Sequence, residues 1–177
     1  MERAELGREL EQLHAACWGW ALACCAHDRE AAEDTLQTAY LRILSGKARF
    51  DGRSSVRTWV FGVVRRTALE ERRRGAARRS RERVAGRESD SAPDPTPGAD
   101  ARVERAEASE ALVAALDTLS PRQRETLHLV FYQDMTIEDA AAVMQISLGS
   151  ARTHYERGKK AMAVALRGRD APDEAAP

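Results

Sequence analysis

The chain has 177 residues, enough for one ordinary domain or two small ones. Hydrophobic residues make up 43% of it but aromatic residues only 5%, and alanine and arginine, both strong helix formers, are plentiful. Alternating runs of β-branched residues are absent from the sequence, so an all-α protein is predicted. The first residues do not resemble a signal peptide, and no apolar run approaches the roughly 20 residues that span a membrane. We therefore expect a cytoplasmic protein with reduced cysteines.

The formal net charge of zero conceals a strong segregation of charge along the chain. Residues 1–40 hold 3 basic and 8 acidic residues, whereas residues 41–83 hold 14 basic and 4 acidic ones. Residues 84–117 are acidic again, with 3 basic and 8 acidic residues. Because the local potential governs binding to phosphates, the balanced total does not argue against nucleic-acid binding.

Apolar residues at helical spacing predict two helices in the first 46 residues. The seam of the first consists of Leu6, Leu10, Leu13, Cys17, Trp20 and Cys24. The seam of the second consists of Ala32, Leu36, Ala39 and Ile43, and Ser45-Gly46 is expected to end that helix. A polar loop with the sequence KARFDGRSS follows, and a third helix is predicted to start near Ser55.

Residues 85–101 contain three prolines and few apolar residues, which predicts a flexible acidic linker. The expected organisation is a first helical domain at 1–84, a linker at 85–102, a second helical domain at 103–168 and a disordered tail at 169–177. The first helix of the second domain is expected to span residues 103–117.

Two sequence signals for helix starts are present in the second domain. Ser120, Pro121 and Gln123 form a capping box with proline at the first helical position, and the next apolar residues, Leu127, Val130 and Phe131, are expected to form a buried stripe. Thr136 begins a further helix, and a tight turn at residues 145–147 leads into the last one. This arrangement is a helix-turn-helix, whose second helix enters a DNA major groove. A plain helical hairpin with a solvated outer face is the alternative.

At this point the residues resemble a known family. The runs AEDTLQTAYLRIL and RFDGRSSVRTWVFGVVRRTALEERRR resemble region two of the extracytoplasmic-function (ECF) sigma factors, and LSPRQRETLHLVFYQDMTIEDAAAVMQISLGSARTHYERGKKAM resembles their region four. The resemblance covers residues 10–80 and 108–166. It implies a transcription initiation factor that binds core RNA polymerase, directs it to specific promoters and helps melt the minus-ten element.

The resemblance also implies roles for individual residues. Docking on the polymerase falls to Glu33, Asp34, Leu36, Gln37, Tyr40 and Leu41. The alternative for Glu33 and Asp34 is that they only favour a helix start through its dipole.

Recognition of the minus-ten element falls to Arg49, Phe50, Gly52, Arg53, Ser54, Ser55, Arg57, Trp59, Arg65 and Arg66. For Trp59 the helical spacing with Val56 and Val63 favours a place in the core over a stacking platform. The alternative for the arginines is a solvated basic face.

Recognition of the minus-thirty-five element falls to Ser150, Arg152, Thr153, His154, Arg157 and Lys159. The chain departs from the family at Gln145, where glycine is common. A left-handed non-glycine residue costs on the order of 1 kcal/mol, so the turn should still form.

The sequence gives less support to other functions. A metal site could be sought among His14, Cys17, Cys24, Cys25 and His27. Cys17 and Cys24 already belong to the apolar seam, and His14 and Cys24 would be about 15 Å apart along one helix, so no metal site is expected. No enzyme motif is present in the sequence, and no cofactor is expected. A helix-turn-helix regulator that binds DNA alone, or a sequestering factor, remains the alternative. An anti-sigma factor is the expected further partner, and the free protein is expected to be a monomer.

Overall fold

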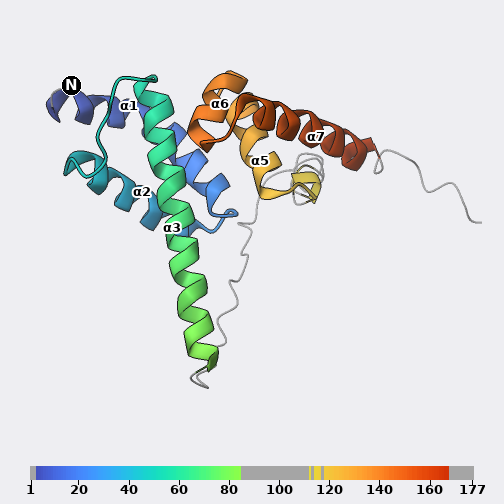
Figure 1. Ribbon diagram of the computed structural model, residues 1–177, viewed down its shortest axis with the longest axis horizontal. Coiled ribbons are helices and arrows are strands. Elements are labelled where there is room, and N and C mark those ends of the chain that lie inside the picture. The colour runs from blue at the N-terminus through green and yellow to red at the C-terminus, as the bar shows by residue number, and fades with distance from the viewer. Residues whose placement is uncertain (1–2, 85–111, 113, 117, 168–177) are drawn as a thin grey trace, which may run out of the picture.

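The computed structural model describes residues 3–84, 112, 114–116 and 118–167 (Figure 1). Every regular element in these residues is helical, in agreement with the predicted all-α class. The predicted linker at 85–102 and the predicted tail lie outside the described residues, as does most of the expected helix at 103–117. Among the helices described, none is long and apolar enough to cross a membrane.

The first helical part consists of α1 (Arg3–Cys24), α2 (Arg29–Leu44) and α3 (Val56–Val84). Asp28 caps α2, because its carboxylate accepts a hydrogen bond from the amide of Ala31 at 3.0 Å. Trp20 of α1 is completely buried, and its indole Nε1 donates to the carbonyl of Phe61 in α3 at 3.0 Å. The predicted end of the second helix at Ser45-Gly46 and the predicted start of the third near Ser55 agree with α2 and α3 to within about two residues.

The second helical part consists of α5 (Pro121–Leu127), the π-helix η1 (His128–Tyr132), α6 (Ile137–Met144) and α7 (Leu148–Arg167). The capping box predicted at Ser120 and Gln123 is present in both directions. Gln145 adopts the left-handed conformation with φ 54° and ψ 47°, so the turn forms without glycine as expected.

The prediction of a buried stripe at Leu127, Val130 and Phe131 is wrong for Phe131, whose side chain is 59% exposed. The cause is η1, in which the amide of Gln133 bonds to the carbonyl of His128, five residues back. A π-turn is wider than an α-turn, so the side chains that follow it leave the positions assigned by α-helical spacing. Leu129 takes the fully buried place instead.

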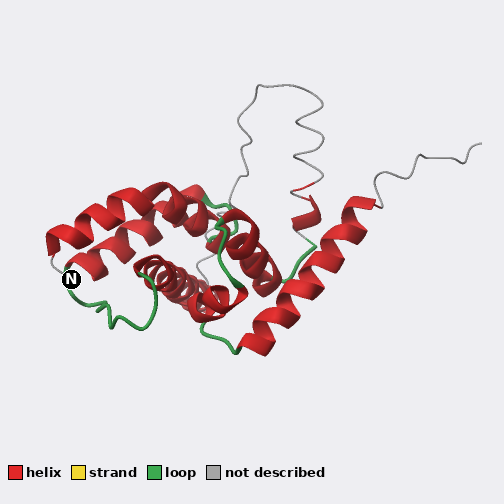
Figure 2. Cartoon of the chain, turned by 90° about the horizontal axis from the view of Figure 1, so that it is seen from above, coloured by secondary structure: helices red, strands yellow, loops and turns green. Residues whose placement is uncertain are grey.

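The two helical parts share one hydrophobic core (Figures 1 and 2). In this core Met144 and Val143 of α6 and Leu129 of η1 join Trp20 and Phe61 of the first part. The carboxyl-terminal portions of α3 and α7 project from the shared body (Figure 1). The two sequence-defined parts thus form a single closed arrangement.

The three cysteines are unpaired and buried in this core. Burial raises the pKa of Cys17 to about 11, and it raises the pKa values of Cys24 and Cys25 as well. A thiol with a raised pKa is a poor nucleophile and a poor metal ligand at neutral pH. No cluster of three or more metal-ligating side chains occurs among the residues that the structure describes.

Candidate nucleic-acid and polymerase interfaces

The helix-turn-helix presents α7 as its outer helix. The hydroxyl of Thr136 caps α6 by accepting from the amide of Asp139 at 3.0 Å, and the hydroxyl of Ser147 accepts from the amide of Ser150 at 3.1 Å. Ala140 and Ala151 are fully buried, which lets α6 and α7 cross closely. The local sequence therefore fixes which side of α7 faces outward.

The outward side carries the residues that the sequence assigned to the minus-thirty-five element. Arg152, Thr153, Arg157 and Lys159 are exposed, whereas Ser150 and His154 are half-buried. Arg152 pairs with Glu138 at 3.5 Å, and Lys159 pairs with Glu156 at 3.7 Å. Exposed ion pairs are worth little, so these cations can be released to phosphates.

Arg122 of α5 adds a cation to this side, which the sequence interpretation did not include. Burial lowers the pKa of His154, and the charges of Arg122 and Arg157 lower it further. Arg122 therefore lies close to His154 of α7 although it is 32 residues away in sequence. Only the packing of α5 on α7 could have revealed it.

The loop before α3 holds the first group of residues assigned to the minus-ten element. Gly52 has a φ of 76°, and the hydroxyl of Ser55 accepts from the amide of Thr58 at 3.1 Å to start α3. Arg49, Arg53 and Ser55 are exposed, and Ser54 is half-buried. Arg53 forms an exposed ion pair with Asp51 at 3.7 Å, so the loop offers two exposed guanidinium groups beside a tight turn.

Trp59 is half-buried rather than displayed for stacking. It packs against the hydrophobic core, and its ring lies 5.3 Å from the ring of Phe50. The two aromatic residues assigned to the minus-ten element therefore contact each other. Trp59 also packs against the edge of the hydrophobic core.

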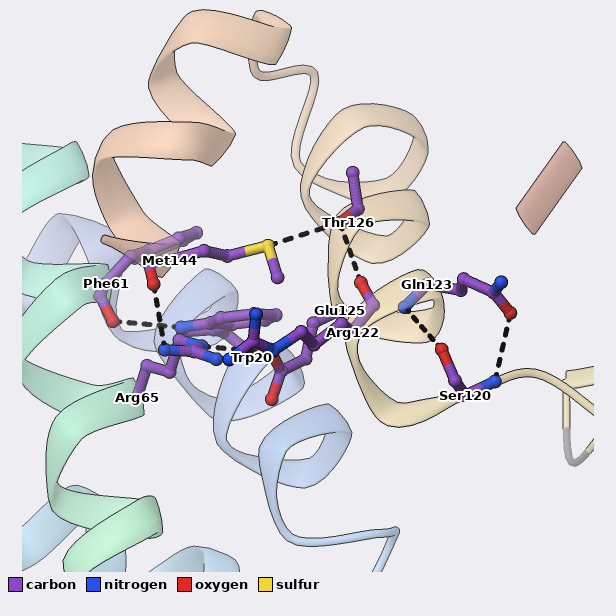
Figure 3. A network of polar contacts seen from close by, with 9 residues as sticks. All are labelled: Trp20, Phe61, Arg65, Ser120, Arg122, Gln123, Glu125, Thr126 and Met144. Carbon is purple, nitrogen blue, oxygen red and sulfur yellow. Dashed lines mark hydrogen bonds and ion pairs between the residues drawn. The ribbon is translucent and has the colours of Figure 1, made fainter. Parts of the chain in front are cut away.

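The second group assigned to the minus-ten element lies on α3 and splits into two sets. Arg66 is exposed, as are Arg72, Arg73 and Arg74 further along the helix. Arg65 instead turns into the molecule, where its Nε and Nη2 both donate to Glu125 of α5, at 3.0 and 2.9 Å (Figure 3). Arg57 is half-buried and donates to Gln133 at 3.1 Å. The second helical part thus covers half of this face.

The residues assigned to polymerase docking lie along α2. Glu33 and Gln37 are exposed and line a groove of about 420 Å³ between α1 and α2, together with Leu36 and Tyr40. Leu36 is otherwise buried in the core, and Leu41 is 63% exposed. The groove also includes Trp18 and His14 of α1, which sequence interpretation did not assign to it.

Asp34 is exposed on a different side of α2. It lines a separate pocket with Cys25, Arg72 and Arg79. Adjacent helix positions point about 100° apart, so Glu33 and Asp34 do not share one flat surface. The structure therefore brings four of the six residues assigned to docking into this groove and leaves Leu41 and Asp34 outside it.

Comparison with known proteins gives two family matches in the same chain. Residues 10–79 match the family described as Sigma-70 region 2, and residues 109–162 match the family described as Sigma-70, region 4. The chain is 29% identical over 144 residues to the ECF RNA polymerase sigma factor SigX of Bacillus subtilis, covering 76% of this chain and 70% of the relative. It is 27% identical over 143 residues to the ECF RNA polymerase sigma factor SigC of Mycobacterium tuberculosis, covering 81% and 74%.

Two solved structures share the fold. One is the sigma factor RpoE in complex with the anti-sigma factor NepR from Bartonella quintana, with a TM-score of 0.65, 23% identity and coverage of 92% of this chain and 97% of that chain. The other is CnrH in complex with the cytosolic domain of CnrY, with a TM-score of 0.65, 16% identity and coverage of 94% and 90%. With both sigma-70 regions present in order on an all-helical fold, the chain belongs to the ECF RNA polymerase sigma factors, non-enzymatic proteins that direct transcription initiation.

Proposed function

We propose that this chain reads two promoter elements and docks on the polymerase through separate surfaces. The outer face of α7 reads the minus-thirty-five element, the loop at 47–55 with α3 reads and helps melt the minus-ten element, and the groove between α1 and α2 binds core RNA polymerase. The observation that carries the proposal is the exposed side of α7, where short polar and basic side chains project together from the second helix of a helix-turn-helix.

The chemistry of each surface supports its role. Arg152 and Arg157 can contact phosphates while Thr153 reaches base edges in the major groove. Arg49 and Arg53 can hold the backbone of a displaced strand, since strand separation needs cations beside an unstacked base. The amino-terminal part, residues 1–40, carries a net negative charge and repels DNA, which is also negative. This repulsion keeps DNA out of the docking groove.

We also propose an anti-sigma factor as a partner, a monomeric state for the free protein and a cytoplasmic location beside the polymerase. Support for the partner comes from a structural neighbour, RpoE, which was solved with the anti-sigma factor NepR. Support for the monomer comes from the closed arrangement, in which each helical part buries its apolar face against the other.

The test is reconstitution with bacterial core RNA polymerase. The chain should copurify with the core enzyme, and run-off transcription from a pool of the host's promoter fragments should give specific products only when both are present. Glu33→Lys with Gln37→Lys should abolish copurification, whereas Glu30→Lys, exposed on the same helix and outside the groove, should not. Binding of the protein alone to duplex DNA without binding to core enzyme would instead make it a conventional regulator.

A further inference from the structure

A cavity of about 340 Å³ lies where the end of α1 meets the second helical part. This volume falls within the range of about 300–1,000 Å³ that small-molecule sites occupy in proteins. Much of the wall is aliphatic and consists of Ala23, Leu112, Leu116, Leu127 and Met162. Because apolar surface is favourably removed from water, these walls suit a ligand with an apolar body.

Two contacts hold the aliphatic wall together. Arg124 Nε donates to the carbonyl of Leu116 at 3.1 Å, which ties that residue to α5. Leu127 of α5 lies against α7 at Gly158, where an added Cβ would be 3.0 Å from Leu127 Cδ1. The cavity is therefore bounded by helices that pack directly on one another.

The π-helix η1 brings three of its five residues to this cavity: His128, Phe131 and Tyr132. π-Helices are rare and occur frequently at functional sites. Phe131 and Tyr132 are 59% and 73% exposed, and the Tyr132 ring stacks on the His128 ring with their centres 5.4 Å apart. Two large rings thus face water at the edge of an apolar cavity, where a ligand could cover them.

The turn after α1 is strained where it reaches the cavity. Ala26 and His27 both have positive φ values, 54° and 66°, and His27 is one of the lining residues. The left-handed region is unfavourable for residues with a Cβ, and residues held there cluster at ligand sites and other functional positions. This strained turn and η1 therefore meet at the same cavity.

The charged side chains around the cavity are basic. Arg124 and Lys159 line it, and no carboxylate is among its lining residues in the described part of the chain. Lys159 Nζ lies 3.7 Å from Glu156, in a pair whose side chains are 46% and 68% exposed. Exposed pairs of this kind are worth little, so the ammonium group can turn to a bound anion. Charge complementarity therefore favours an apolar ligand that carries one negative group.

We propose that this cavity binds a free fatty acid of about ten carbons, with its alkyl chain against the aliphatic and aromatic walls and its carboxylate beside Lys159. The inference does not depend on the promoter contacts proposed above, although Lys159 also belongs to the minus-thirty-five set. Because the walls come from α1 and from the second helical part, the bound ligand contacts both and should stabilise the folded chain.

The test is isothermal titration calorimetry of the full chain with sodium decanoate below its micelle concentration. Decyltrimethylammonium and 1-decanol share the alkyl chain but carry a positive charge and no charge, respectively. Decanoate should bind roughly tenfold more tightly than decyltrimethylammonium, with 1-decanol between them. The melting temperature followed by circular dichroism should rise with decanoate concentration.

Two variants locate the site. Ala23→Phe places a ring in the cavity and should weaken decanoate binding by about tenfold or more, whereas Ala15→Phe, exposed on α1 outside the cavity, should not. Lys159→Met removes the charge but keeps an apolar side chain. It should weaken decanoate binding roughly fivefold and leave 1-decanol binding unchanged. Lys160→Met is its control, because Lys160 is the exposed neighbour that does not line the cavity.

Three results would each overturn the proposal. Equal affinity for decanoate and decyltrimethylammonium would exclude selection for an anion. Unchanged decanoate binding by a folded Ala23→Phe variant would place the ligand elsewhere, and no binding at millimolar decanoate would mean that the cavity takes no such ligand. If circular dichroism shows that Ala23→Phe is unfolded, the comparison of Lys159→Met with Lys160→Met decides the matter, and equal loss in both would overturn the site.

Discussion

At the scale of single residues, the junction of the two helical parts depends on a neutral histidine. His128 lies between Trp20 and Tyr132, with its ring centre 5.4 Å from each of theirs. The side-chain amide of Gln133 lies 3.1 Å from His128 Nε2 and can donate to it when that nitrogen is unprotonated. Burial, and to a smaller extent the neighbouring His27, lowers the pKa of His128 from 6.5 to about 4.

This lowered pKa predicts a loss of stability in mild acid. Between pH 6.5 and 4 the unfolded chain binds a proton at His128 and the folded chain does not, so the free energy of unfolding falls as the pH falls. The expected loss from this residue between pH 7 and pH 5 is about 2 kcal/mol. His128→Phe keeps the aromatic contacts and should remove this component from urea unfolding measured across that range.

The unmodified chain provides the comparison for this experiment. An equal slope in the His128→Phe variant and the unmodified chain would show that another group controls the acid sensitivity.

The turn of the helix-turn-helix gives a second prediction at the residue scale. Gln145 occupies the left-handed region, which strains any residue with a Cβ. Gln145→Gly should raise the free energy of unfolding by about 0.5–1 kcal/mol, because relief of this strain exceeds the added entropy of the unfolded chain. Chemical denaturation would measure it, and a destabilised variant would show that the Gln145 side chain has an unrecognised contact.

At the scale of secondary-structure elements, α7 packs on α5 through a glycine. A Cβ at Gly158 would lie 3.0 Å from Cδ1 of Leu127 and 3.2 Å from its Cγ. Gly158→Val should therefore separate the two helices and lower the free energy of unfolding by about 1–3 kcal/mol. Gly149 lies in the same helix with nothing within 4 Å, so Gly149→Ala should be neutral or stabilising. Equal effects of the two changes in thermal unfolding would show that this packing is loose.

The sequence predicted some features of the helices correctly and others not. The caps at Ser120 and Thr136 and the turn at Gln145 were predicted correctly because the interactions that form them lie within a few residues. The exposure of Phe131 was not predicted, because the π-turn that causes it has no sequence signature comparable to a capping box.

The candidate site was predictable only in part for a related reason. The exposure of Arg152, Thr153, Arg157 and Lys159 on α7 follows from local helical spacing, and these four side chains are exposed in the structure. The contact between Arg65 and Glu125 joins residues 60 positions apart on two different helices. Each looks like an ordinary surface charge in its own helix, so only the packing of the two parts shows that they are paired.

At the scale of the whole molecule, the exposed cations of α7 give a prediction for the assembled polymerase. Arg152→Ala combined with Arg157→Ala should weaken holoenzyme binding to the upstream promoter element by roughly tenfold or more and leave binding to the core enzyme unchanged. Each lost phosphate contact should also lower the dependence of log affinity on log salt by about one. Titrations of promoter duplex at several salt concentrations would measure both quantities.

Arg167→Ala, at the exposed end of α7, provides the control for this pair. It should leave both the affinity and the salt dependence close to those of the unmodified protein. Loss of core binding in the double variant would mean that the DNA surface and the polymerase surface have been assigned the wrong way round.

The core that joins the two parts has a consequence for temperature. Leu129, Met135, Val143 and Met144 are buried in that core, and separating the parts would hydrate some of this apolar surface. Hydration of apolar groups raises the heat capacity and becomes less unfavourable on cooling. The fraction of molecules in which the two parts are separated should therefore rise on cooling.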